Sequence, residues 1–167
     1  VWWVVAAVSA LVVVALAPLR SARADVPVEL VGQWGGPPYA VAVEGNRITH
    51  RASQLLRPPR KRFEFTSVHG IRWSDVVDAP TFAEAWPGLA KILKGASFLA
   101  AHNASFDRSV LETCCAAAEF RPPSLTFRCS MQLARSTWGL RPTTLPAVCA
   151  HLGIPLRHHD AVSDAEA

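Results

Sequence analysis

The sequence predicts one domain of mixed α/β fold, and three observations lead to this prediction. The chain has 167 residues, half of them hydrophobic, so it can bury a core and is not disordered. A strand hairpin is expected early in the chain, and alternating helices and a strand follow it. That later strand is apolar on both faces, which is typical of a parallel strand covered by helices.

The hairpin is predicted from two strand-forming segments around a tight turn. Tyr39–Glu44 has the composition of a strand, and Gly45-Asn46 follows it. Asn can adopt the positive φ that such a turn needs. Residues 47–56 are expected to form the second arm. Six basic residues and no acid lie between Arg47 and Arg62, and they form either a solvated strand edge or a stripe that contacts phosphates.

Helices and one buried strand are expected beyond the hairpin. Thr81 and Glu84 fit a capping box at the start of a helix. Residues 96–101 are an apolar run without alternation, which favours a strand buried on both faces. Further helices are expected over residues 104–118, with an apolar face of Phe106, Val110, Leu111 and Cys114, over Ser130–Trp138, over residues 144–152, which Gly153 ends, and from about Asp160.

The first 24 residues differ in composition from the rest of the chain. Residues 1–17 are all Val, Ala, Leu or Trp apart from Ser9, and Pro18 follows them. This run approaches the length of a membrane-spanning helix, and small residues near Arg23 resemble a signal cleavage site. The segment is therefore either an anchor or export signal, or a stretch foreign to the fold. We expect the domain to occupy residues 25–167, with its last helix interrupted at the terminus.

Charge and cysteine content exclude several classes of protein. The net charge is +4, which permits a polyanionic partner without requiring one. The four cysteines are too sparse for a disulfide scaffold. No Cys-x-x-Cys spacing occurs, which excludes a zinc ribbon. We expect the cysteines to be reduced, buried thiols.

Two polar segments contain the residues that are suited to catalysis. Residues 102–107 (HNASFD) follow the buried strand, where α/β proteins bind ligands, and Asp107 lies one turn into the next helix. Residues 158–164 (HHDAVSD) contain His159 and, one turn into a helix, Asp164. Two carboxylates and a histidine can bind Mg²⁺ or Mn²⁺ for phosphodiester hydrolysis, with the histidine as general base. Alternatively, both carboxylates are ordinary helix acids.

The chain from about residue 39 to residue 167 resembles the DEDDh 3′–5′ exonucleases, relatives of the proofreading epsilon subunit of bacterial DNA polymerase III. The segment HNASFD is similar to the second exonuclease motif of that family. His159, followed by Asp164 after four intervening residues, is similar to its third motif. Further similar segments are residues 68–71 (VHGI), before the helix that begins near Thr81, residues 133–135 (LAR) and residues 152–154 (LGI).

This resemblance implies a fold, a reaction and a set of site residues. The fold would be ribonuclease H-like, a five-stranded mixed sheet flanked by helices. Asp107 and Asp164 would hold two divalent cations, Mg²⁺ or Mn²⁺, and His159 would be the general base. The reaction would release nucleoside monophosphates from 3′ ends of single-stranded DNA or RNA, with a DNA polymerase as partner and the cytoplasm as location. The residues implied to lie near the terminal nucleotide are Asn103, Val68 and His69.

The family's first motif, Asp-x-Glu on the first strand, is not recognisable here. Its two carboxylates share one strand face because side chains alternate with a period of two. Asp25 lies near the expected position, but residue 27 is Pro and the next acid is Glu29. In a strand these two acids would be roughly 13 Å apart. Asp25 and Glu29 remain candidate metal ligands, and either the hydrophobic leader replaces the family's first strand or this region is misread.

Three functions are consistent with these observations. The first is a metal-dependent 3′–5′ exonuclease. The second is a catalytically impaired pseudo-exonuclease that binds nucleic acid, because Asp-x-Glu is missing. The third is a membrane-anchored interaction protein, because residues 1–17 are so apolar. The 2′-OH distinguishes RNA from DNA, and no residue here identifies a partner for it, so that choice stays open.

Overall fold

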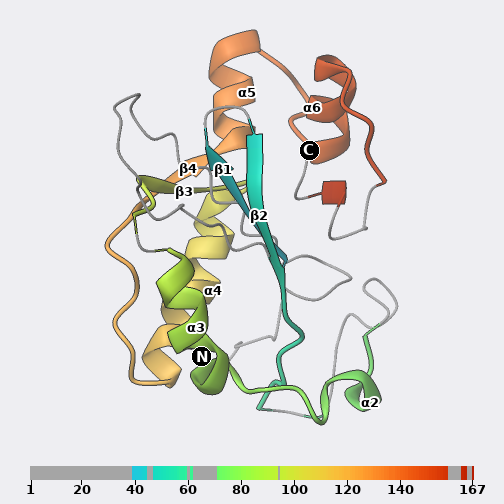
Figure 1. Cartoon of the computed structure of the whole chain (residues 1–167). Coiled ribbons are helices and arrows are strands. Elements are labelled where there is room, and N and C mark those ends of the chain that lie inside the picture. The colour runs from blue at the N-terminus through green and yellow to red at the C-terminus, as the bar shows by residue number, and fades with distance from the viewer. Residues whose placement is uncertain are drawn as a thin grey trace, which may run out of the picture.

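The computed structural model describes residues 39–44, 47–59, 61, 71–93, 95–157, 163–164 and 167. These residues form a mixed α/β structure, as the sequence predicts (Figure 1). In chain order the elements are β1 (Tyr39–Glu44), β2 (Arg47–Ser53), α2 (Trp73–Val76), α3 (Phe82–Ile92), β3 (Phe98–Ala101), α4 (Ala104–Ala117), β4 (Thr126–Cys129), α5 (Ser130–Trp138) and α6 (Leu145–Leu152).

The described strands form one antiparallel and one parallel pair. The hairpin prediction is confirmed, since β1 pairs with β2 in antiparallel register from Tyr39 opposite Ser53. The second arm ends at Ser53, not at residue 56, so the predicted end was wrong. Beyond it the Arg57 amide donates to the Pro80 carbonyl at 2.8 Å, so the chain has left the hairpin for the segment before α3.

The parallel pair is the part of the fold that positions the functional site. β3 pairs with β4 in parallel register, Phe98 opposite Thr126, which confirms the prediction of a parallel strand. Sequence analysis missed β4, because its four residues alternate between exposed and half-buried and offer no apolar run. The Arg128 guanidinium of β4 lies 4.3 Å from the centre of the Phe98 ring. The four-residue helix α2 was missed as well.

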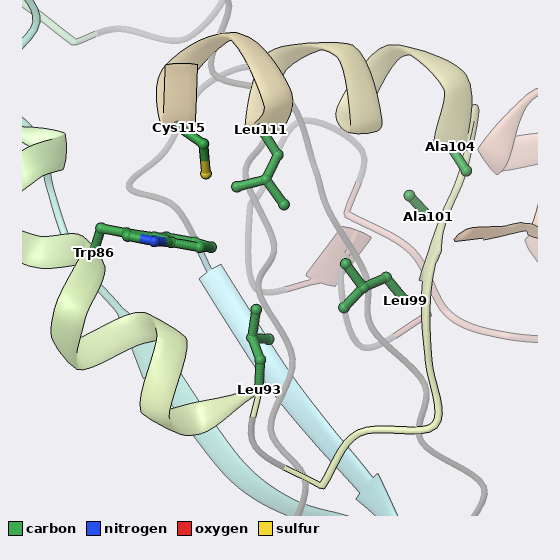
Figure 2. Close-up of a cluster of buried hydrophobic side chains, with 7 residues drawn as sticks. All are labelled: Trp86, Leu93, Leu99, Ala101, Ala104, Leu111 and Cys115. Atoms are coloured by element: carbon green, nitrogen blue, oxygen red, sulfur yellow. The ribbon is translucent and has the colours of Figure 1, made fainter. Parts of the chain in front are cut away.

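The core lies between helices α3 and α4 and the strand β3. Figure 2 shows Trp86 and Leu93 pointing toward Leu99 of β3 and toward the buried face of α4. Leu99 is completely buried. Since α4 contacts both β3 and β4, the core fixes this helix on the parallel strands. The buried cluster consists of Trp86, Leu93, Leu99, Ala101, Ala104, Leu111 and Cys115.

Leu99→Ala is expected to destabilise the chain by about 2–5 kcal/mol, because it removes buried methyl groups and leaves a cavity. Chemical denaturation of the two proteins measures this difference. Leu133→Ala is the matched control, since Leu133 is 60% exposed, and it should change the free energy of unfolding by less than about 0.5 kcal/mol. Equal effects of the two substitutions would contradict the placement of the core.

Local signals explain where several helices begin and end. Thr81 accepts a hydrogen bond from the Glu84 amide, and the Glu84 carboxylate accepts one from the Thr81 amide at 2.7 Å. The predicted capping box is therefore confirmed. Helix α6 ends at Gly153, whose φ of 68° lies in the left-handed region that favours glycine. This stop is also as predicted.

The buried face of α4 differs from the predicted one. Ala104, Asp107, Leu111 and Cys115 are buried, whereas Phe106, Val110 and Cys114 of the predicted stripe are only half-buried. The spacing of the observed face is helical, but one of its four members is a carboxylate. Because the prediction considered apolar residues alone, it placed the buried face too far around the helix axis. The face matters because it places Asp107 against the core.

Two further predictions concern the cysteines and the membrane. All four cysteines are free thiols, as expected, but only Cys115 and Cys149 are buried. No helix in the described part of the chain is long and apolar enough to cross a bilayer. The predicted leader over residues 1–24 lies outside the described residues.

Candidate active site

The junction between β3 and α4 places Asp107 at the carboxyl end of the parallel strands. Asn103 makes this junction tight: its φ of 81° and ψ of 46° are left-handed, a conformation that Asn tolerates better than most residues. Helix α4 begins with the next residue, so Asp107 lies in its first turn. The Asn103 side chain is exposed and accepts a hydrogen bond from the Ser105 hydroxyl at 3.3 Å.

The carboxylate of Asp107 is buried without a counter-charge among the described residues. Only 3% of the residue is exposed, and its Oδ1 atom has no hydrogen-bond partner there. Burial raises the pKa of Asp107 from 3.8 to about 8, and a backbone hydrogen bond opposes this rise only in part. Burying an uncompensated carboxylate is costly. A bound cation would remove that cost.

Asp164, the second predicted carboxylate, is also buried, with 5% of the residue exposed. Burial raises the pKa of the Cys149 thiol in α6, and the negative charge of Asp164 adds to this rise, so the two residues are near each other. In Figure 1 the short red segment of residues 163–164 is drawn below α6. The preceding residue, Ser163, is held by the Arg157 amide, which donates to its hydroxyl at 2.7 Å.

A hydrogen-bond network around His102 joins the elements that lie next to these carboxylates. The Nδ1 atom of His102 is 3.0 Å from the Ser130 hydroxyl at the start of α5. Its Nε2 atom is 2.9 Å from the carbonyl oxygen of Thr143, just before α6. The Thr143 hydroxyl in turn accepts a hydrogen bond from Arg135 at 2.9 Å. The end of β3 is thereby connected to both α5 and the start of α6.

Some of the predicted site residues lie in the described part of the chain, and others lie outside it. Asp107 and Asp164 are both buried and Asn103 is exposed at the end of β3. Among the described residues, no three His, Cys, Asp or Glu side chains are grouped closely enough to hold a metal ion. The predicted residues that lie outside the described part of the chain are His159, Asp25, Glu29, Val68 and His69.

The donor set that is described fits a hard divalent cation in its chemistry. Carboxylate oxygens are the ligands that Mg²⁺ and Mn²⁺ prefer. Asp107 offers a buried carboxylate that no described Arg or Lys neutralises. Asp164 offers a second buried carboxylate from a different segment. Two carboxylates are fewer than a closed site needs, so further ligands must come from elsewhere.

Some cations of the basic segment between Arg47 and Arg62 contact other parts of the protein. Arg57 donates a hydrogen bond to the Val77 carbonyl at 3.1 Å and lies 3.9 Å from the Glu84 carboxylate. The Lys61 ammonium lies 5.6 Å from the centre of the Trp73 ring. The side chain of Arg47 is exposed. Two of the six cations therefore help to attach this segment to α2 and α3, and phosphate contact stays a prediction.

The mixed α/β fold is the ribonuclease H-like architecture that solved exonuclease structures share. The chain belongs to the exonuclease family RNase_T, whose model matches residues 40–167. It is 33% identical over 131 residues to the PolC-type DNA polymerase III of Oceanobacillus iheyensis. It is 29% identical over 128 residues to the enzyme of the same name from Thermotoga maritima.

These matches cover most of this chain and a small part of each relative. They span 77% and 75% of the chain but only 9% of either polymerase. Two solved structures share the fold. Exonuclease X in complex with 5′-overhanging duplex DNA has a TM-score of 0.63 and 24% identity, and covers 92% of this chain and 84% of its own. A 3′-exonuclease recognising a histone mRNA stem-loop has a TM-score of 0.65 and 14% identity. That match covers 96% of this chain and 78% of the exonuclease chain.

Sequence reasoning included His102 in the segment HNASFD but did not identify its contacts. The contacts of His102 reach 28 and 41 residues along the chain, so no local spacing reveals them. Cys149 was expected to be buried, but its position beside Asp164 was not. The one available signal was the place of His102 directly after β3, at the edge where the candidate ligands gather.

Proposed function

We propose that this chain is a metal-dependent 3′–5′ exonuclease, which hydrolyses phosphodiester bonds of nucleic acid and releases nucleoside monophosphates. The observation that supports this function best is Asp107, a buried carboxylate with no counter-charge among the described residues, at the carboxyl end of β3. A structural helix acid would have no reason to be desolvated at such cost. A carboxylate that binds a cation would have such a reason, because the cation compensates its buried charge.

The proposed site uses the carboxylates as ligands. Asp107 and Asp164 would hold two divalent cations, Mg²⁺ or Mn²⁺, and Asp25 and Glu29 are the proposed sources of further carboxylate oxygens. When bound, a pair of such ions orients the attacking water and stabilises the leaving oxygen. His159 accepts the proton of the water, since a histidine pKa lies near neutral pH. The proposed contacts to the terminal nucleotide are Asn103, Val68 and His69.

The proposed substrate and setting follow from the similar proteins. One of the solved structures with this fold is bound to DNA and the other recognises RNA, so 3′ ends of DNA or RNA are the proposed substrates. Both curated relatives are DNA polymerases, which supports a DNA polymerase as the proposed partner. We propose residues 25–167 as the exonuclease domain and the cytoplasm as its location.

A catalytically impaired pseudo-exonuclease is the second candidate, and one observation favours it. The chain lacks a recognisable Asp-x-Glu, and in a strand Asp25 and Glu29 would lie roughly 13 Å apart, too far to chelate one ion. Without those carboxylates, the two described acids would hold at most part of a metal pair. Such a chain would bind single strands without cutting them.

A cleavage assay with the 167-residue chain distinguishes the two candidates. Single-stranded DNA and RNA labelled at the 5′ end are incubated with Mg²⁺, Mn²⁺ or EDTA, alongside oligonucleotides whose 3′ end is blocked. The exonuclease is expected to produce a ladder that shortens from the 3′ end, disappears with EDTA and is absent from blocked strands. Binding without cleavage in Mn²⁺ by a folded chain would support the pseudo-exonuclease. Cleavage of blocked strands would contradict the proposed direction.

A further inference from the structure

The side chain of His102 connects parts of the chain that are far apart in sequence. It follows the last residue of β3, and its two ring nitrogens contact the first residue of α5 and the residue before the N-cap of α6. The ring is half-buried. Thr143, its partner beside α6, is 6% exposed, and the contact between the two residues is part-buried. Breaking it would leave the Thr143 carbonyl without this partner in a largely buried residue, which is costly.

The contact with Thr143 determines which nitrogen of His102 carries the proton. A carbonyl oxygen can only accept, so Nε2 must donate to Thr143. In the neutral ring Nδ1 then has a free lone pair, and the Ser130 hydroxyl donates to it at 3.0 Å. Both nitrogens are therefore used, and the orientation of the ring is fixed from two sides.

The segment that His102 holds leads to the second carboxylate. Thr143 is followed by Thr144, the N-cap of α6, and α6 contains Cys149, beside which Asp164 lies. The first carboxylate, Asp107, lies on the same junction as His102, one turn into α4. The imidazole is thus the hydrogen-bonded connection between the segment that bears Asp107 and the helix against which Asp164 lies.

We propose that His102 is a positioning residue, which ties the start of α6 to the end of β3 and so keeps Asp107 and Asp164 in one site. In this role it contacts Ser130 and Thr143, not substrate or cation. Its part in catalysis rests on the proposed function, whereas its hold on α6 does not. Residues behind a metal site that orient its ligands typically contribute 10- to 100-fold to activity or metal affinity.

Two amide substitutions separate the contacts of the ring. The amide of Gln in His102→Gln can reach the place of Nε2 and donate to Thr143, whereas Asn in His102→Asn is shorter and reaches only the place of Nδ1. We expect amide hydrogen exchange of the metal-free chain in α6 to be about tenfold faster with Asn and nearly unchanged with Gln, since about 1.4 kcal/mol corresponds to tenfold. Gln132→Asn, at an exposed position of α5, is the control.

Activity is the second readout of the same variants. With Asn we expect kcat to fall about 10- to 100-fold, KM for a short single strand to change little, and Mn²⁺ affinity to fall, while Gln restores kcat. Equal exchange in α6 for Asn and Gln overturns the proposal, and so does faster exchange with an unchanged kcat. If the unsubstituted chain does not cleave, the proposed function fails, and the exchange data still decide whether His102 holds α6.

Discussion

Asp107→Asn is expected to abolish cleavage and yet to stabilise the metal-free chain at pH 8. The carboxylate is buried and its pKa is raised to about 8, so ionisation in the folded state is unfavourable. Asn has nearly the same shape and carries no charge, so it removes that penalty. It also removes an anionic ligand, which a divalent cation requires. Stability and activity therefore change in opposite directions at this position.

The pH dependence of stability follows from the same pKa. The folded chain binds a proton at Asp107 more tightly than the unfolded chain does, because the pKa is about 8 when folded against 3.8 ordinarily. The stabilising effect of that proton is complete below about pH 4 and is lost as the pH rises to 8. The loss amounts to about 6 kcal/mol at most.

Chemical denaturation at pH 5 and pH 8 in EDTA measures this effect. We expect Asp107→Asn to gain stability over the unsubstituted chain at pH 8 much more than at pH 5. Mn²⁺ at pH 8 is expected to raise the melting temperature of the unsubstituted chain and not that of the variant. Lower stability of the variant at pH 8 without metal would contradict the assignment of Asp107 as a desolvated carboxylate.

Asp164→Asn is expected to reduce cleavage at least about 100-fold, because a metal ion at such a site contributes several kcal/mol to transition-state stabilisation. The chain should stay folded, since Asn conserves the volume of the side chain beside Cys149. Initial rates on a 5′-labelled single strand measure the loss. The matched control is Asp78→Asn, an exposed acid before α3, which should leave the rate unchanged. A rate within tenfold of the unsubstituted chain would exclude Asp164 as a ligand.

Local patterns predicted the elements that depend on neighbouring residues. The capping box of Thr81 and Glu84, the left-handed stop at Gly153 and the bounds of α5 follow from side chains within one turn, and the structure confirms all of them. The strand before HNASFD was predicted from an apolar run without alternation, which indicates burial on both faces, and Phe98 and Leu99 are indeed buried. Such elements need no information about distant contacts.

The missed features depend on contacts between distant parts of the chain. β4 is a strand because it pairs with β3, although its own residues alternate between exposed and half-buried. The buried face of α4 includes Asp107, and Leu111 is the residue that it shares with the predicted apolar stripe. The contacts of His102 with Ser130 and Thr143 arise only when β3, α5 and α6 meet. For the candidate site, sequence reasoning named both buried carboxylates but not the network behind them.

Anomalous diffraction tests directly whether Asp107 and Asp164 are ligands of the same metal site. Crystals of the 167-residue chain grown with Mn²⁺ at pH 8 would be measured at the manganese absorption edge. We expect an anomalous peak within about 2.2 Å of a carboxylate oxygen of each residue. Manganese bound elsewhere, or carboxylates that face separate sites with no ion between them, would contradict this expectation.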